Sequence, residues 1–109
     1  MMKRISFVGR SLNDLKLFPE DAKREAGFQL DKVQRGIEPT DWKPIKTVGA
    51  SVREIRINDG QGIFRVIYVA KYADTIFVLH AFKKKSQKTA QIDLDIAKQR
   101  LKIVIQETQ

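Results

Sequence analysis

The chain has 109 residues, of which 42% are hydrophobic and 31% charged; this length and composition exclude a disordered chain and predict one globular domain over residues 1–109. The absence of cysteine and the single histidine exclude disulfides, thiolate metal sites and histidine metal clusters, so we expect no metal or other cofactor. The formal net charge of +8 favours a polyanionic partner, such as nucleic acid or an acidic membrane surface. No signal-peptide core or apolar run of roughly 18 residues is present, so we expect a cytoplasmic location.

The first third of the chain predicts a strand followed by two helices. Residues 3–9 (KRISFVG) alternate apolar and polar side chains before a glycine, which is typical of a strand. Ser11 is a candidate cap for a short helical turn, and Pro19 opens a longer helix that ends at Gly36. One apolar stripe runs along this longer helix, formed by Ala22, Ala26, Leu30 and Val33. Its two alanines indicate close packing on a sheet.

The remainder predicts three strands and a last helix. Residues 37–49 contain two prolines and a glycine and indicate an irregular connection. Three β-rich runs follow, separated by short turns, which predicts an antiparallel meander over residues 52–58, 63–70 and 75–82. Apolar residues at spacings of four and three predict an amphipathic helix over about residues 89–106. We therefore expect an α+β fold in which helices cover one face of a small mixed sheet and leave the other face open.

Arg65 lies in the middle of an apolar strand pattern, on the face opposite Phe64 and Val66. Two interpretations of this arginine are open. It is the buried partner of Glu54 on the preceding strand, or a planar donor whose fork binds two phosphate oxygens at once, and both can hold together. Arg56 shares a face with Glu54 and is expected to lie beside Arg65. Two like charges side by side are destabilising unless an anion lies between them, which favours the phosphate interpretation.

A basic run, KKKSQK, follows the last predicted strand. Its lysines are either a solvated strand end that resists aggregation or, together with Arg56 and Arg65, part of a positive surface for a phosphate backbone. Phe82 offers a stacking surface for an unpaired base. His80 is a candidate general acid or base, and the alternative is a hydrogen-bonded packing residue.

The order of elements, together with VREIRI (52–57), FRVIYV (64–69) and VLHAFKKKSQKT (78–89), resembles the phage-derived HigB-like branch of the RelE/ParE superfamily, toxins of type II toxin–antitoxin systems. FPEDAKREAGFQLDKVQRG (18–36) is also similar to the helical segment of the family, so the resemblance covers nearly the whole chain. Relatives of the RelE and HigB kind are small endoribonucleases that cut messenger RNA on the ribosome without a metal. The resemblance implies the same for this chain. It also implies a cognate antitoxin, often of the helix-turn-helix type, in a toxin–antitoxin hetero-oligomer.

The resemblance also implies roles for individual residues. Arg65 matches a phosphate-binding catalytic arginine, Arg56 matches a catalytic-site lysine and Lys84 a further catalytic arginine. Glu54 and Ala90 depart from the family pattern, where RelE has a lysine and a tyrosine, so proton transfer is expected to fall to the histidine or to a lysine among 83–85. The predicted catalytic set is Arg56, Arg65, His80 and Lys84. The predicted RNA-binding set is Arg53, Phe82, Lys83, Lys85 and Lys88.

Two alternatives to a nuclease are open. ParE relatives share the fold but inhibit DNA gyrase without an RNA-cutting site. A non-catalytic RNA-binding or phage-related module fits the charge equally well. The predicted catalytic set favours the nuclease, because a gyrase inhibitor has no evident need for a convergent phosphate site.

Overall fold

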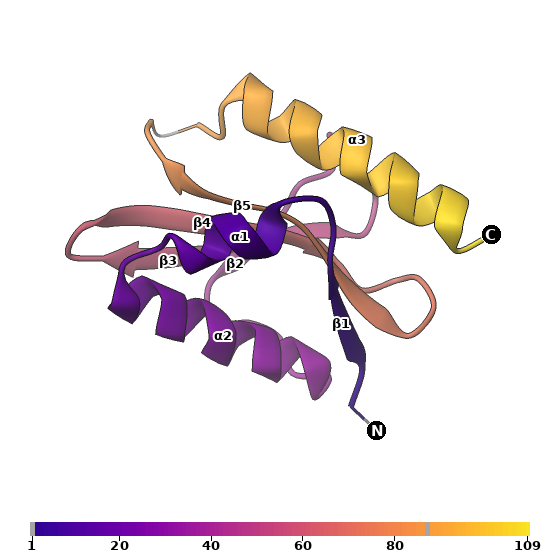
Figure 1. Ribbon diagram of the computed structural model, residues 1–109, viewed down its shortest axis with the longest axis horizontal. Coiled ribbons are helices and arrows are strands. Elements are labelled where there is room, and N and C mark those ends of the chain that lie inside the picture. Colours follow the sequence, from indigo (N-terminus) through magenta and orange to yellow (C-terminus); the bar gives the residue numbers. More distant parts are fainter. Residues whose placement is uncertain (1, 87) are drawn as a thin grey trace.

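The computed structural model describes residues 2–86 and 88–109 (Figure 1). Its elements, in chain order, are β1 (Arg4–Phe7), α1 (Ser11–Lys16), α2 (Glu20–Gln34), β2 (Trp42–Pro44), β3 (Val52–Asp59), β4 (Gly62–Val69), β5 (Thr75–Lys84) and α3 (Gln91–Glu107). Every predicted element is present within a few residues of its expected bounds. The additional strand β2 lies in the segment expected to be irregular, because three residues ending in a proline are too short to show a periodic pattern. Within the described part of the chain, none of the helices combines the length and apolarity that crossing a bilayer requires.

The five strands form one mixed sheet in the order β1-β5-β4-β3-β2. β1 pairs with β5 in parallel, and the other neighbours are antiparallel, which confirms the predicted meander. Strand β5 contains a bulge, because Ile67 of β4 pairs with His80 whereas the next residue, Tyr68, pairs with Val78. The extra residue is Leu79. Since a bulge turns successive side chains toward one face, Leu79 and His80 both face α3.

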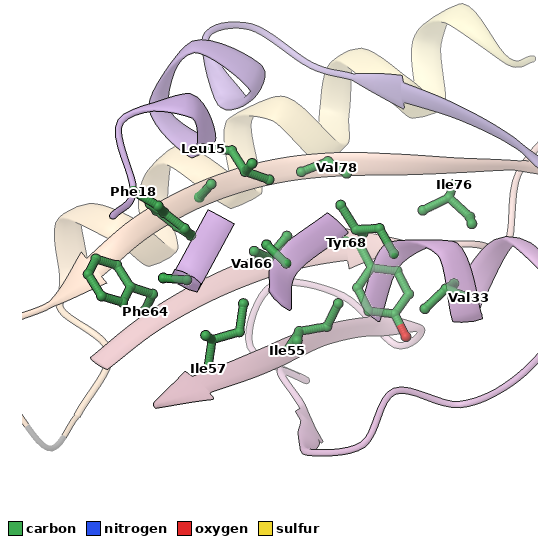
Figure 2. Packing of buried hydrophobic residues seen from close by; sticks show 14 residues of the cluster. Leu15, Phe18, Val33, Ile55, Ile57, Phe64, Val66, Tyr68, Ile76 and Val78 are labelled. Carbon is green, nitrogen blue, oxygen red and sulfur yellow. The ribbon is translucent and has the colours of Figure 1, made fainter. Parts of the chain in front are cut away.

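Helices α1 and α2 cover one face of the sheet, over a core whose members are shown in Figure 2. The predicted stripe of α2 is buried there against Ile55, Val66 and Tyr68. Ala26 is fully buried, and its small side chain lets the helix backbone approach the strands closely. Ser11 does not cap α1 as expected. It is the first helical residue, and its Oγ donates a hydrogen bond to the carbonyl oxygen of Val78 at 3.1 Å, which ties α1 to β5.

Helix α3 packs on the opposite face, so the prediction that all helices lie on one face of the sheet is wrong (Figure 1). Ala97, Leu101 and Val104 of α3 form a second apolar cluster with residues from this face of the sheet, among them Ile67 and Leu79. The strands are apolar on both faces over part of their length, and such strands need cover on both sides. The α+β class with a mixed sheet is confirmed.

Candidate active site

The face that α3 only partly covers carries three cross-strand rows of side chains. The rows are Lys43, Glu54, Ile67 and His80; then Arg56, Arg65 and Phe82; then Asn58, Ile63 and Lys84. Arg56 is directly opposite Arg65, on the face that strand alternation predicted. Four of the side chains in these rows are basic, and they gather where β3, β4 and β5 approach their common end. We call Lys43, Arg56, Arg65 and Lys84 the basic cluster.

Glu54 is the buried centre of the basic cluster. The glutamate is 0% exposed and Arg65 is 6% exposed, with Arg65 Nε 3.4 Å from Glu54 Oε1. Lys43 Nζ lies 3.6 Å from the same oxygen, and Thr89 Oγ1 donates a hydrogen bond to Glu54 Oε2 at 2.9 Å. Arg65 Nη1 donates to the carbonyl oxygen of Phe64 at 3.0 Å. The ion pair between Arg65 and Glu54 that was one of the two interpretations is therefore present. It fixes the guanidinium on the buried side of the basic cluster.

Arg56, Lys43 and Lys84 are partly exposed, in contrast to the buried Arg65. The Arg56 side chain is 38% exposed, with Nη1 3.8 Å from Asp41 Oδ1. Burial lowers the pKa of Lys84, and the positive charges of Arg65, Lys43 and Arg56 lower it further, against the opposing effect of Glu54. Burial likewise lowers the pKa of Arg65, with Glu54 opposing and Arg56 reinforcing the shift. The arginine stays charged at neutral pH. The cluster is thus a region of positive potential, and Glu54 and Asp41 partly neutralise it.

His80 is buried beside the basic cluster and is fixed by two contacts. Its Nε2 is 2.7 Å from Asp93 Oδ1, in the first turn of α3. Its ring stacks on Phe82, with centroids 4.8 Å apart and an interplanar angle of 18°. Its Nδ1 is buried and has no hydrogen-bond partner among residues 2–86 and 88–109. This geometry matches the packing interpretation of His80. Neither ring nitrogen is directly available to a ligand.

The other predicted RNA-binding residues are not brought into this group. Arg53 lies on the opposite face, where its guanidinium is 4.0 Å from the Trp42 ring centroid and 3.8 Å from a Glu38 carboxylate oxygen. Lys83 also points to that face, with Nζ 6.0 Å from the Phe64 ring centroid. Lys85 and Lys88 are exposed between β5 and α3. Of the predicted RNA-binding residues, Phe82 contacts the site, through its stacking on His80.

Four residues that the fold brings to the site were not predicted from the sequence: Asp41, Lys43, Thr89 and Asp93. Lys43 lies on the unpredicted strand β2. Asp93 and Thr89 have an ordinary local explanation, because acidic and hydroxyl side chains are common at helix starts. Their contacts depend on which face of the sheet α3 covers, which helical periodicity alone does not indicate.

Comparisons with known proteins place the chain in a family. Residues 13–102 match the sequence profile of the family described as phage-derived protein Gp49-like. Among solved structures, an arginine-to-alanine double mutant of the E. coli toxin RelE in the free state is similar, with a TM-score of 0.65, 14% sequence identity and coverage of 95% of this chain and 99% of that chain. This likeness confirms the predicted RelE-like fold. No match was found among curated proteins. Because the profile spans most of its length, the chain belongs to the phage-derived Gp49-like family.

Proposed function

We propose that this protein is the toxin of a type II toxin–antitoxin system and acts as a metal-independent endoribonuclease on messenger RNA at the ribosome. The observation that supports this most strongly is the placement of Arg56 opposite Arg65 on adjacent strands, with Lys43 and Lys84 beside them. Like charges in direct cross-strand contact destabilise the empty protein. Glu54 compensates Arg65 and Lys43 only in part, so a phosphate that enters the cluster gains strong, partly desolvated interactions.

The proposed chemistry assigns separate tasks to the accessible and buried members of the cluster. In the reaction the 2′-hydroxyl attacks the adjacent phosphodiester, and negative charge develops on the phosphate oxygens. Arg56 donates hydrogen bonds to these oxygens from the exposed side of the cluster, and the positive charge of Arg65 stabilises them from the buried side. The lowered pKa of Lys84 makes its ammonium a better acid than an ordinary lysine, suited to protonate the leaving 5′-oxygen.

We further propose that a cognate antitoxin, of the helix-turn-helix type found with HigB-like toxins, neutralises the protein in the cytoplasm. The net charge of +8 supports this, since an acidic segment of the antitoxin competes with RNA for the same cations. Binding would form a toxin–antitoxin hetero-oligomer that excludes messenger RNA from the basic cluster.

One observation favours a second candidate, a non-catalytic RNA-binding module. Arg65 and His80 are both buried in the described structure, and the Arg65 guanidinium is already engaged by Glu54. A module that only holds RNA needs Arg56 and Lys84 at its surface and needs no proton transfer. The two candidates differ in whether bound messenger RNA is cut.

The test is induction of the wild type, Arg56→Ala and Arg24→Ala in a bacterial host that lacks the antitoxin, with growth followed and messenger 5′ ends mapped. Arg56 is a better target than Arg65, because removing Arg65 leaves Glu54 buried without its partner and can unfold the protein. Arg24 is a matched control, since it is an exposed arginine of α2 that pairs with Asp21 and lies outside the basic cluster. We expect growth arrest with new cuts inside translated codons, lost in Arg56→Ala and kept in Arg24→Ala.

Other outcomes would contradict the nuclease. Arrest with intact messages and DNA damage would indicate a gyrase inhibitor of the ParE kind. Retention of RNA on the protein without any cut would establish the non-catalytic module. Equal activity of Arg56→Ala and the wild type would remove the basic cluster from the mechanism.

A further inference from the structure

The pair formed by His80 and Asp93 borders the basic cluster and has no part in the chemistry described so far. Endonucleolytic attack by a 2′-hydroxyl needs a group that accepts its proton. The two carboxylates that face the basic cluster are already engaged with its cations. Glu54 faces Arg65 and Lys43 and accepts a hydrogen bond from Thr89, and Asp41 Oδ1 lies 3.8 Å from Arg56 Nη1. A nearby carboxylate that is not paired with these cations is therefore the better candidate for the acceptor.

His80 cannot meet a substrate in the arrangement described. Nε2 is hydrogen-bonded to Asp93 Oδ1 at 2.7 Å, Nδ1 is buried, and Phe82 covers one face of the ring. An N–H on Nε2 that donates to the carboxylate holds that carboxylate in one orientation. Such a contact is typical of a residue that positions a catalytic group rather than one that acts on the substrate.

Asp93 is the accessible member of the pair. Its side chain is 20% exposed, and Oδ2 accepts no hydrogen bond from residues 2–86 or 88–109. The start of α3 is anchored over the sheet twice, by Thr89 on Glu54 and by Asp93 on His80. Both anchors lie in the cross-strand row next to that of Arg56 and Arg65, and rows on one face are about 7 Å apart along the strands. Asp93 is thus held at the border of the proposed phosphate site.

We propose that Asp93 is the general base of the site and that His80 is its positioning residue. This inference deepens the proposed endoribonuclease function and rests on it. Asp93 Oδ2 takes the proton of the 2′-hydroxyl while the 2′-oxygen forms a bond to phosphorus. The bond between phosphorus and the 5′-oxygen breaks, and that oxygen takes a proton from Lys84. The products are a 2′,3′-cyclic phosphate and a 5′-hydroxyl, and exchange with water returns both side chains to their starting charges.

The experiment measures single-turnover cleavage and binding of a short messenger RNA on purified ribosomes by the wild type, Asp93→Asn, His80→Gln and Asp95→Asn. An asparagine keeps the acceptor for His80 Nε2 and removes the base, so cleavage should fall about 100-fold with unchanged affinity and melting temperature. A glutamine at position 80 keeps an N–H for Asp93, so most of the cleavage rate should remain. Asp95 is an exposed aspartate of the same helix that accepts a hydrogen bond from Gln91, and its variant should cleave like the wild type.

Two results would overturn the assignment while leaving the nuclease intact. One is wild-type cleavage by Asp93→Asn; the other is a His80→Gln protein as inactive as Asp93→Asn, which would make the histidine itself the proton-transfer group. If Asp93→Asn melts at a lower temperature, Asp93→Glu and Asp93→Gln give a second comparison at equal length, in which only the carboxylate should restore cleavage. Intact messages with the wild type would instead overturn the proposed function and this inference with it.

Discussion

The two faces of the sheet are built by the same strands and differ in what they bury. Toward α1 and α2, the strands contribute apolar side chains such as Ile55, Val66 and Val78. Toward α3, they bury Glu54, Arg65 and His80 beside an apolar cluster. An ionisable group in the interior persists only when partners compensate its lost hydration. One face therefore stabilises the fold by apolar packing, and the other holds charged groups in fixed positions at a cost in stability.

The largest effect on stability is expected from Glu54→Ala. Removing the carboxylate leaves Arg65 buried without its counter-charge, and we expect the free energy of unfolding to fall by about 3–5 kcal/mol in urea titrations. The matched control is Glu38→Ala, whose side chain is 67% exposed and pairs with Arg53 at 3.8 Å. That change should cost less than about 1 kcal/mol. A small effect of Glu54→Ala would mean that Arg65 is solvated and that the two faces do not differ as described.

A smaller effect is expected from neighbouring changes on α2. Ala26→Leu inserts a larger side chain between α2 and the sheet and should lower the free energy of unfolding by about 1–3 kcal/mol. Gly27→Ala should raise it by about 1 kcal/mol, because this glycine lies inside the helix and an added Cβ meets nothing within 4 Å. Urea titration of both variants measures the opposite signs. Tolerance of leucine at position 26 would show that the packing face is loose.

The smallest expected effects are opposite slopes of stability with pH on the two faces. Lys84 has a pKa below the ordinary 10.5 in the folded protein, so just below pH 10.5 the unfolded chain binds more protons than the folded protein. Stability should therefore rise as the pH rises toward 10.5. Tyr68 has a pKa raised above 10.0 by burial, so the unfolded chain loses its proton first and stability should fall above pH 10. Urea titrations between about pH 8 and about pH 11 measure these slopes. The first slope should be absent in Lys84→Met and the second in Tyr68→Phe. Unchanged slopes in these variants would contradict the assignments.

Much of the site follows from local periodicity, and the remainder depends on tertiary placement. A strand period of two was enough to put Arg56, Arg65 and Glu54 on one face, because alternation is a local property of the backbone. The position of α3 was not predictable in this way, since an amphipathic helix fits either apolar face of a sheet. The contacts of Asp93 and Thr89 therefore stayed hidden. Arg53 was grouped with the other cations by charge alone, although alternation already placed it on the other face.

The parallel pairing of β1 with β5 has a consequence for how the chain is made. Ser11 Oγ reaches the carbonyl oxygen of Val78, 67 residues away, and Arg4 pairs with Thr75. During synthesis β1 cannot pair with β5 until β5 has left the ribosome. Contacts of such long sequence separation form slowly. The sheet of the growing polypeptide thus stays incomplete until β5 emerges, and β1 is among the last strands to pair although it precedes the other four.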